Sequence, residues 1–189
     1  MTLASINADG WVAGVQHLPS DNYHARLEGV AVSLVVIHGI SLPPGEFSGD
    51  AVAALFTNRL DCNAHPYYQR LRDLRVSAHF FIRRDGALVQ FVSTECCAWH
   101  AGESTWRGQT QCNDFSIGIE LEGSDDTPYC NAQYTQLAEL IDILAQRYPH
   151  LLVAGHADIA PQRKTDPGTT FAWDTLFNLI GEHRNGRTT

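Results

Sequence analysis

The sequence is short of basic residues and contains no apolar run long enough to cross a membrane. Its 189 residues include 13 lysines and arginines against 21 aspartates and glutamates, which gives a formal net charge of -8. Non-specific nucleic-acid binding needs a basic face that displaces counterions from phosphates, so we expect no nucleic-acid partner. A transmembrane helix needs about 20 consecutive apolar residues, so we expect no membrane partner either.

Secretion and redox motifs are also missing. Residues 1–10 lack the basic start and the apolar core of a secretory signal. The cysteines lack the paired CxxC spacing of zinc ribbons and redox motifs, and we interpret all five as reduced thiols: Cys62, Cys96, Cys97, Cys112 and Cys130. These absences predict a cytoplasmic protein, which we expect to be a monomer.

No internal repeat, low-complexity segment or linker divides the chain. A length of 189 residues with 44% hydrophobic residues fits one compact domain with its own core. We therefore expect a single domain over residues 1–189, with its core between about residues 11 and 180. The polar tail from Glu182 is expected to be frayed.

Apolar patterns predict several strands. Residues 33–38 are β-branched and apolar, which is typical of a strand buried on both faces. Residues 77–82 and 87–92 flank an Asp-Gly pair, a strong hairpin signal. Residues 115–122 alternate, so one face should be core and the other free for chemistry. Residues 151–155 form another short strand.

Three segments have helical periodicity. Residues 48–60 indicate a short helix, residues 131–148 a longer one that Asn131 caps, and residues 173–180 a last helix whose aromatic residues pack on the sheet. The region from Cys62 to Tyr68 is expected to be a loop. Helices on a central mixed sheet make an α/β or α+β layered domain.

Two of the nine histidines directly follow predicted strands. His38 and His156 lie where a rigid sheet presents a side chain at its rim, and Asp166 follows ten residues after His156. Two imidazoles and one carboxylate can form a three-ligand zinc site with a fourth position open for water. The spacing alone is not specific, because Asp166 could equally be a buried residue that caps a turn.

Acidic and basic side chains near this set are candidates for catalysis. Glu120 and Glu122 share the polar face of the alternating strand beside Gly118, and the pattern alone neither chooses between them nor excludes two solvated carboxylates. Lys164 lies two residues before Asp166, so in an extended segment both would face one site. A solvated loop lysine is the alternative.

Trp99 and Arg75 are secondary candidates. A tryptophan near a glycine can form a flat wall for a sugar ring, although packing for Trp99 and a surface position for Arg75 are the ordinary explanations.

The assembled motifs resemble a known family. The sequence is similar to zinc-dependent N-acetylmuramoyl-L-alanine amidases, which share a fold with phage amidases and peptidoglycan recognition proteins, and within them to the cytoplasmic AmpD type of muropeptide recycling. The matching motifs are SLVVIH (33–38), ISLPPGEF (40–47), HPY (65–67), LRVSAHF (74–80), AWHAG (98–102), CNDFSIGIELEG (112–123), GH (155–156), DIAP (158–161) and RKTDPG (163–168).

The resemblance implies roles for individual residues. It implies that His38, His156 and Asp166 bind Zn²⁺, that Glu120 rather than Glu122 is the catalytic carboxylate, and that Lys164 assists it. It also places four residues along the substrate groove: Arg75, Trp99, His100 and Asn113. The chain departs from the family at Gly39, where asparagine is usual, at Ala157, where cysteine is common, and at Gln111, a position that is often basic.

The activity implied is hydrolysis of the amide between (1,6-anhydro-)N-acetylmuramic acid and L-alanine of muropeptides. Two alternatives stay open: an amidase acting on intact peptidoglycan, and a non-catalytic peptidoglycan-binding module. The intact metal and acid–base residues argue against the second.

Overall fold

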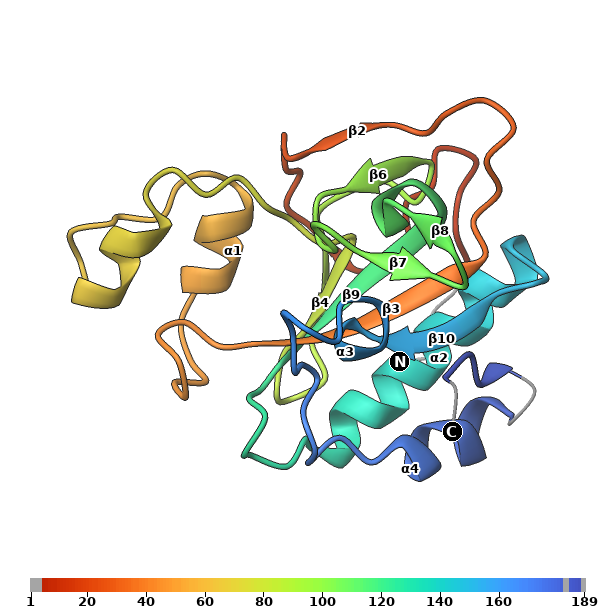
Figure 1. Cartoon of the computed structure of the whole chain (residues 1–189). Helices are drawn as coiled ribbons and strands as arrows, with labels where there is room; N and C mark the ends of the chain where they lie inside the picture. The colour runs from red at the N-terminus through yellow and green to blue at the C-terminus, as the bar shows by residue number, and fades with distance from the viewer. Residues whose placement is uncertain (1–4, 182–183, 188–189) are drawn as a thin grey trace.

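A six-stranded mixed sheet with parallel central strands organises the molecule (Figure 1). The computed structural model describes residues 5–181 and 184–187. The strand order is β1-β5-β4-β9-β3-β10, and only the β4–β5 pair is antiparallel. These strands are β1 (Gln16–His17), β3 (Leu34–Ile40), β4 (Phe80–Ile82), β5 (Leu88–Gln90), β9 (Ser116–Glu122) and β10 (Leu152–Gly155). The predicted mixed sheet is confirmed.

Two small antiparallel pairs lie outside this sheet. The first joins β2 (Tyr23–Ala25) to β6 (Cys96–Ala98), and the second joins β7 (Thr105–Trp106) to β8 (Gln109–Thr110). Both lie on the face of the main sheet opposite helix α2 (Asn131–Arg147), as Figure 1 shows. They therefore help to build the side of the molecule that α2 leaves free.

The central strands match the predicted segments, with one correction. β3 is buried along its first five residues, as its apolar composition predicts. In β9 the predicted alternation holds, since Ile117, Ile119 and Leu121 pack in the core. The opposite face is not solvated, however, because β9 lies between β3 and β4 and all seven of its residues are buried.

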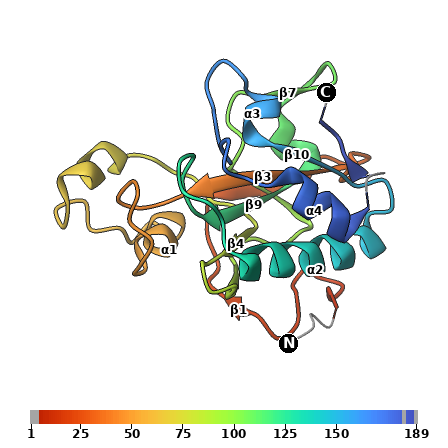
Figure 2. The same cartoon turned by 90° about the horizontal axis from the view of Figure 1, so that it is seen from below.

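Helices α2 and α4 (Trp173–Ile180) cover one face of the sheet (Figure 2). The apolar stripe of α2 and the aromatic residues of α4 join the strand side chains in the largest core cluster, which confirms both helices. Asn131 does not cap α2. The capping residue is Cys130, whose N–H donates to the Gln133 side chain at 3.0 Å.

The remaining helical segments are short. They are α1 (Ala51–Phe56), α3 (His156–Ile159) and the 3₁₀ turns η1 (Pro66–Leu71) and η2 (Cys112–Phe115). The predicted helix over residues 48–60 is confirmed in its central part. The expected loop over residues 62–68 is wrong at its end, because Pro66 fixes a helical φ at the first position of η1 and the His65 ring accepts a hydrogen bond from the Tyr67 N–H.

The C-terminal segment is docked where the structure describes it. Glu182 and His183 lie outside the described residues, but Asn185 forms a parallel bridge with Val153 of β10. The Gly186 N–H donates to the Val153 carbonyl at 3.0 Å, and Arg187 donates to Asp158 at 2.9 Å. The expectation of a frayed tail is therefore wrong for residues 184–187.

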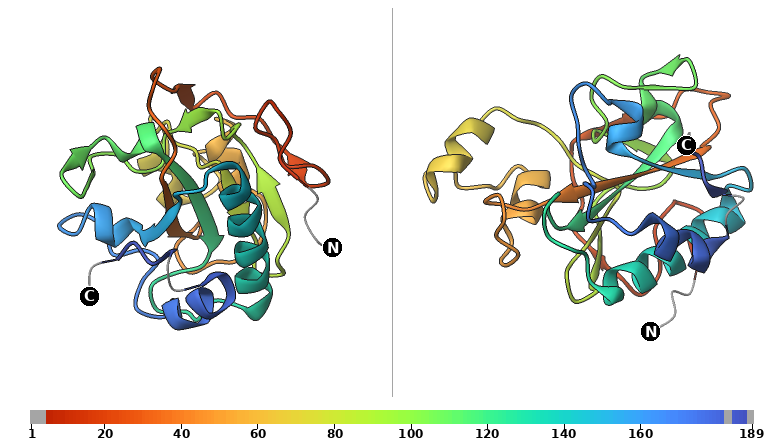
Figure 3. Two further views of the ribbon diagram at one scale, coloured as in Figure 1. Left: turned by 90° about the vertical axis from the view of Figure 1, so that its right-hand side faces the viewer. Right: turned by 60° about the horizontal axis from the view of Figure 1, so that its bottom comes forward.

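The parallel strands end together at one edge of the sheet. The carboxyl ends of β3, β9 and β10 meet at the same edge, and the right-hand view of Figure 3 shows loops and a short helix, α1 (Ala51–Phe56), beyond it rather than α2. Crevices outside the carboxyl ends of parallel strands are the usual ligand sites of open sheets. Within the described residues, no helix is long and apolar enough to cross a membrane.

Candidate metal centre and active-site groove

Neighbouring strands bring the predicted metal and acid–base residues together. His38 is the fifth residue of β3 and pairs in register with Glu120 of β9, so the two side chains leave the same face of the sheet. His156 follows β10 directly and begins α3. Asp166 lies on the loop after α3, where its carbonyl accepts a hydrogen bond from the Ala157 N–H at 2.9 Å.

The three predicted metal ligands converge. The Nδ1 atoms of His38 and His156 are 2.9 Å apart, and the Asp166 Oδ2 atom lies 3.3 Å from the first and 3.1 Å from the second. Burial alone would raise the pKa of Asp166, but the adjacent His156 and His38 rings hold it well below its usual range. Both histidine side chains are almost fully buried.

A chain of hydrogen bonds fixes which nitrogen of His38 carries a proton. The Ser116 hydroxyl lies 2.5 Å from the Cys112 carbonyl, which only accepts, so Ser116 donates there and accepts from His100 Nε2–H at 3.2 Å. The unprotonated Nδ1 of His100 then accepts from His38 Nε2–H at 2.9 Å. Burial lowers the pKa of His100 well below normal and, with His156 nearby, that of His38 to about 4. Neutral His38 therefore presents an unprotonated Nδ1 to the site.

His156 is oriented by a second acceptor. Its Nε2 atom lies 3.1 Å from the Ala101 carbonyl, so the neutral ring donates there and its Nδ1 also carries a lone pair. Two lone pairs and one carboxylate thus face one another with no proton between them, an arrangement that a cation stabilises. Two imidazole nitrogens and a carboxylate are a common ligand set of catalytic zinc sites.

Glu120 lies beside this centre as a buried acid. Its Oε2 atom has no hydrogen bond among the described residues. Burial and the nearby Asp166 carboxylate raise the pKa of Glu120 well above its ordinary value, and the Lys164 ammonium opposes that shift. Glu122 differs, because its carboxylate accepts a hydrogen bond from the Arg84 N–H at 3.0 Å. The solvated alternative for the two glutamates is excluded by their burial.

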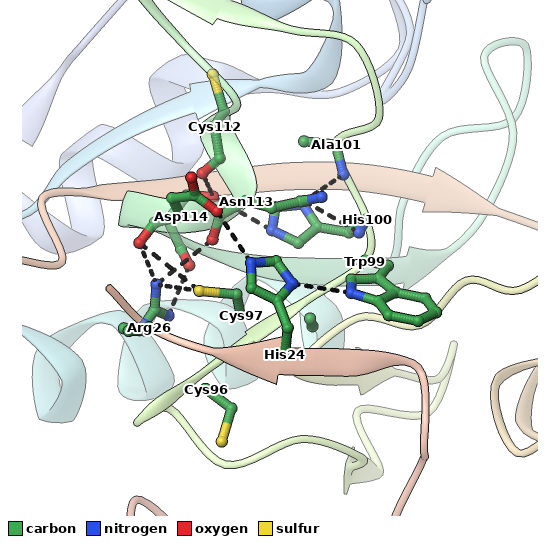
Figure 4. Close-up of polar contacts among 12 residues, drawn as sticks. His24, Arg26, Cys96, Cys97, Trp99, His100, Ala101, Cys112, Asn113 and Asp114 are labelled. Atoms are coloured by element: carbon green, nitrogen blue, oxygen red, sulfur yellow. Dashed lines mark hydrogen bonds and ion pairs between the residues drawn. The ribbon is translucent and has the colours of Figure 1, made fainter. Parts of the chain in front are cut away.

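A groove of about 830 Å³ opens over these residues. Its lining includes all nine side chains predicted above, so the secondary candidates Arg75 and Trp99 lie on the same surface as the metal centre. Asn113 lines the groove, but its side-chain Oδ1 atom is engaged, accepting hydrogen bonds from the His100 and Ala101 N–H groups. Figure 4 shows Asn113 turned toward these two residues.

Some residues of the site carry no sequence signal. The hydrogen bonds from Ser116 to His100 and from His100 to His38 join segments that are far apart in the chain. The departure at Gly39 also has a spatial reason, since a Cβ there would collide with the Tyr129 hydroxyl, which donates to the Pro167 carbonyl at 2.9 Å. The missing side chain at Gly39 therefore leaves the space that the Tyr129 hydroxyl occupies, a contact that the sequence around either residue does not predict.

Comparison with known proteins gives matches over most of the chain. A family model described as N-acetylmuramoyl-L-alanine amidase matches residues 28–169. The chain is 53% identical over 174 residues to the 1,6-anhydro-N-acetylmuramyl-L-alanine amidase AmpD of Citrobacter freundii, covering 91% of this chain and 93% of that protein. It is 51% identical to the AmpD of Escherichia coli strain K12, with coverage of 92% and 96%.

Solved structures agree with these matches. A crystal structure of a selenomethionine AmpD derivative has a TM-score of 0.90 and 50% identity, covering 95% of this chain and 99% of that chain. The amidase AmiD from E. coli, solved with the substrate anhydro-N-acetylmuramic acid-L-Ala-D-gamma-Glu-L-Lys, has a TM-score of 0.58 and 31% identity over 82% of this chain and 60% of that chain. The likeness extends over sequence and fold together.

Proposed function

The chain belongs to the N-acetylmuramoyl-L-alanine amidase family, and we propose that it hydrolyses the amide bond between 1,6-anhydro-N-acetylmuramic acid and L-alanine in muropeptides. The observation that carries this proposal is the centre itself. Three ligand atoms free of protons converge beside a buried carboxylate, Glu120, whose Oε2 atom has no partner among the described residues. That pair of features is what hydrolysis of an unreactive amide requires.

The metal of this centre is proposed to be Zn²⁺, held by Nδ1 of His38, Nδ1 of His156 and the Asp166 carboxylate. A bound zinc ion supplies Lewis acidity and lowers the pKa of water toward about 7. The hydrogen-bond chain from Ser116 through His100 to His38 keeps the His38 Nδ1 atom unprotonated. A ligand nitrogen in this state does not have to lose a proton when a cation binds.

Glu120 is proposed as the acid–base group. As a water oxygen bonds to the amide carbonyl carbon, one of its O–H bonds breaks and Glu120 takes that proton. The C–N bond then breaks, and Glu120 returns the proton to the alanine nitrogen, because an amine leaves poorly unless it is protonated. The raised pKa of Glu120 suits a group that must both take and give a proton near neutral pH.

The surrounding groups position the substrate and balance charge. The Lys164 ammonium acts on Glu120 through its charge and is suited to stabilise negative charge on the carbonyl oxygen. Trp99 is proposed as a flat wall for the sugar, with Arg75, His100 and Asn113 along the groove. The AmiD structure with an anhydro-muramyl peptide supports this class of ligand. We also propose that the enzyme acts in the cytoplasm, since its five cysteines are free thiols, and that it acts as a monomer.

Product analysis by mass spectrometry tests the proposal. Zinc-loaded protein is mixed in parallel with anhydro-muropeptide, ordinary muropeptide and intact cell-wall sacculi. We expect free peptide chiefly from the anhydro substrate. Equal cleavage of sacculi would assign the enzyme to wall lysis, and no cleavage with zinc bound would leave a binding module. Glu120→Gln should keep zinc and lose most turnover, and unchanged turnover in that variant would refute the assignment of Glu120.

A further inference from the structure

We propose that His24 is a positioning residue that fixes the Trp99 indole along the groove and so sets how tightly substrate binds. The inference rests on the proposed function, in which Trp99 contacts the sugar. His24 belongs to β2, outside the main sheet, and none of the motifs of the resemblance includes it. Figure 4 shows its ring between Trp99 on one side and Asp114 on the other.

Both ring nitrogens of His24 are engaged. The Trp99 indole Nε1–H lies 2.9 Å from His24 Nδ1, and His24 Nε2 lies 3.0 Å from the Asp114 carboxylate. An indole N–H only donates, so His24 Nδ1 must be the acceptor. The proton of the neutral ring is then on Nε2, directed at Asp114. The carboxylate thereby holds the tautomer that the indole needs.

Asp114 is itself firmly placed. Its carbonyl accepts from the Arg26 guanidinium at 2.8 Å, and the same guanidinium donates to the Ser116 carbonyl at 2.9 Å. The preceding residue, Asn113, accepts hydrogen bonds from the His100 and Ala101 N–H groups through its side-chain Oδ1 atom. One turn, η2, therefore anchors both the loop that carries the indole and the imidazole that orients it.

The indole has one polar atom, and His24 is its partner. The Trp99 backbone is fixed separately, since its N–H donates to the Asn22 carbonyl and its carbonyl accepts from the Ser77 N–H. Those bonds leave the side-chain rotation free. A hydrogen bond at the far end of the ring removes that freedom before substrate arrives, and such preorganisation strengthens binding.

A second metal site is the competing interpretation, because His24, Cys97 and Asp114 have ligand atoms close enough to share an ion. Two contacts argue against it. The His24 nitrogens are already committed to Trp99 and Asp114, and the Arg26 guanidinium lies 3.6 Å from the Cys97 sulfur. A permanent positive charge at that distance opposes a cation. Burial also raises the pKa of the Cys97 thiol, which disfavours the thiolate that a metal needs.

The kinetic test compares two substitutions of His24. His24→Phe keeps a ring but has no acceptor, whereas His24→Gln offers a carbonyl to the indole and an amide to Asp114. We expect His24→Phe to raise KM by about 2- to 10-fold, the range of one neutral hydrogen bond, with kcat nearly unchanged. His24→Gln should restore much of the loss. His150→Phe, which replaces an exposed histidine elsewhere, serves as the matched control.

A double-mutant cycle shows whether the effect passes through the indole. In a Trp99→Phe background the N–H is absent, so His24→Phe should change KM no further. An equal rise of KM in both backgrounds, or an unchanged KM in the single variant, would overturn the proposal.

The Trp99 indole resonance in a ¹⁵N-labelled NMR spectrum gives a readout that needs no substrate. Its assignment comes from the signal that disappears in Trp99→Phe. We expect the resonance to move in His24→Phe and to stay near its original position in His24→Gln and His150→Phe. An unmoved resonance in His24→Phe contradicts the hydrogen bond. A wild-type enzyme that cleaves no muropeptide would instead refute the proposed function, so the two failures are distinguishable.

Discussion

Ser116 is joined to the His38 ring by two hydrogen bonds, through His100. Replacing Ser116 therefore tests whether this chain of hydrogen bonds keeps the His38 Nδ1 atom unprotonated. In Ser116→Ala, the Nε2–H of His100 loses its acceptor inside the protein. An unsatisfied buried donor costs about 1–3 kcal/mol. His100 can avoid that cost by moving its proton to Nδ1, but this atom faces His38 Nε2–H at 2.9 Å. His38 must then move its own proton to Nδ1, where the metal would bind.

The expected result is a zinc affinity about 10- to 100-fold lower, the usual effect of losing a partner behind a metal ligand. That range corresponds to about 1.4–2.8 kcal/mol, which agrees with the cost of the unsatisfied N–H. Competition against a chromogenic zinc chelator measures it. Ser33→Ala, before the neighbouring strand β3, is the control and should keep wild-type affinity. His100→Phe should weaken zinc to a similar extent, and the double variant should add little because both residues act through one chain. Unchanged affinity in Ser116→Ala would refute the reasoning.

Three further predictions follow from the same centre. Asp166→Ala removes the carboxylate from the ligand set and should leave protein that loses zinc on dialysis, as metal analysis by mass spectrometry would detect. Gly118→Ala places a methyl group against the buried His100 ring, so we expect about 1–3 kcal/mol of destabilisation and weaker zinc binding, measured by thermal unfolding and chelator competition. Glu120→Gln should stabilise metal-free protein more at about pH 8 than at about pH 5. Burial raises the pKa of Glu120 in the folded state, so the folded chain holds the proton to higher pH than the unfolded chain, and wild-type stability falls as pH rises above the unfolded value of about 4.3. If the melting temperatures of Glu120→Gln and wild type differ by the same amount at both pH values, the pKa of Glu120 is not raised in the folded protein.

Local patterns were sufficient for most elements. The apolar run that became β3 and the Asp-Gly hairpin between β4 and β5 depend on neighbouring residues alone, so the sequence predicts them well. The same holds for His156, which directly follows β10, but β3 continues past His38 to Ile40, so His38 lies within the strand and not after it as the sequence predicts. The C-terminal segment was harder, because its docking depends on contacts with β10 and Asp158 rather than on its own polarity.

The features that the sequence patterns missed depend on the order of the strands in the sheet and on contacts between separate segments. Alternation in β9 indicated two faces but not that β3 and β4 would flank the strand and bury Glu120. Likewise, Asn131 is a plausible capping residue by type, yet the contact between Cys130 and Gln133 sets the start of α2. The link from Ser116 through His100 to His38 joins three separate segments, so no window of sequence contains it.

The short C-terminal segment beside β10 also bears on how this protein behaves in concentrated solution. β10 is the last strand on its side of the sheet, and an open strand edge is a template on which another molecule can add. Asn185 and Gly186 occupy backbone positions of that edge at Val153. Removing residues 184–187 would expose these groups, so self-association and aggregation should rise in a truncated chain even though none of the removed residues lines the groove.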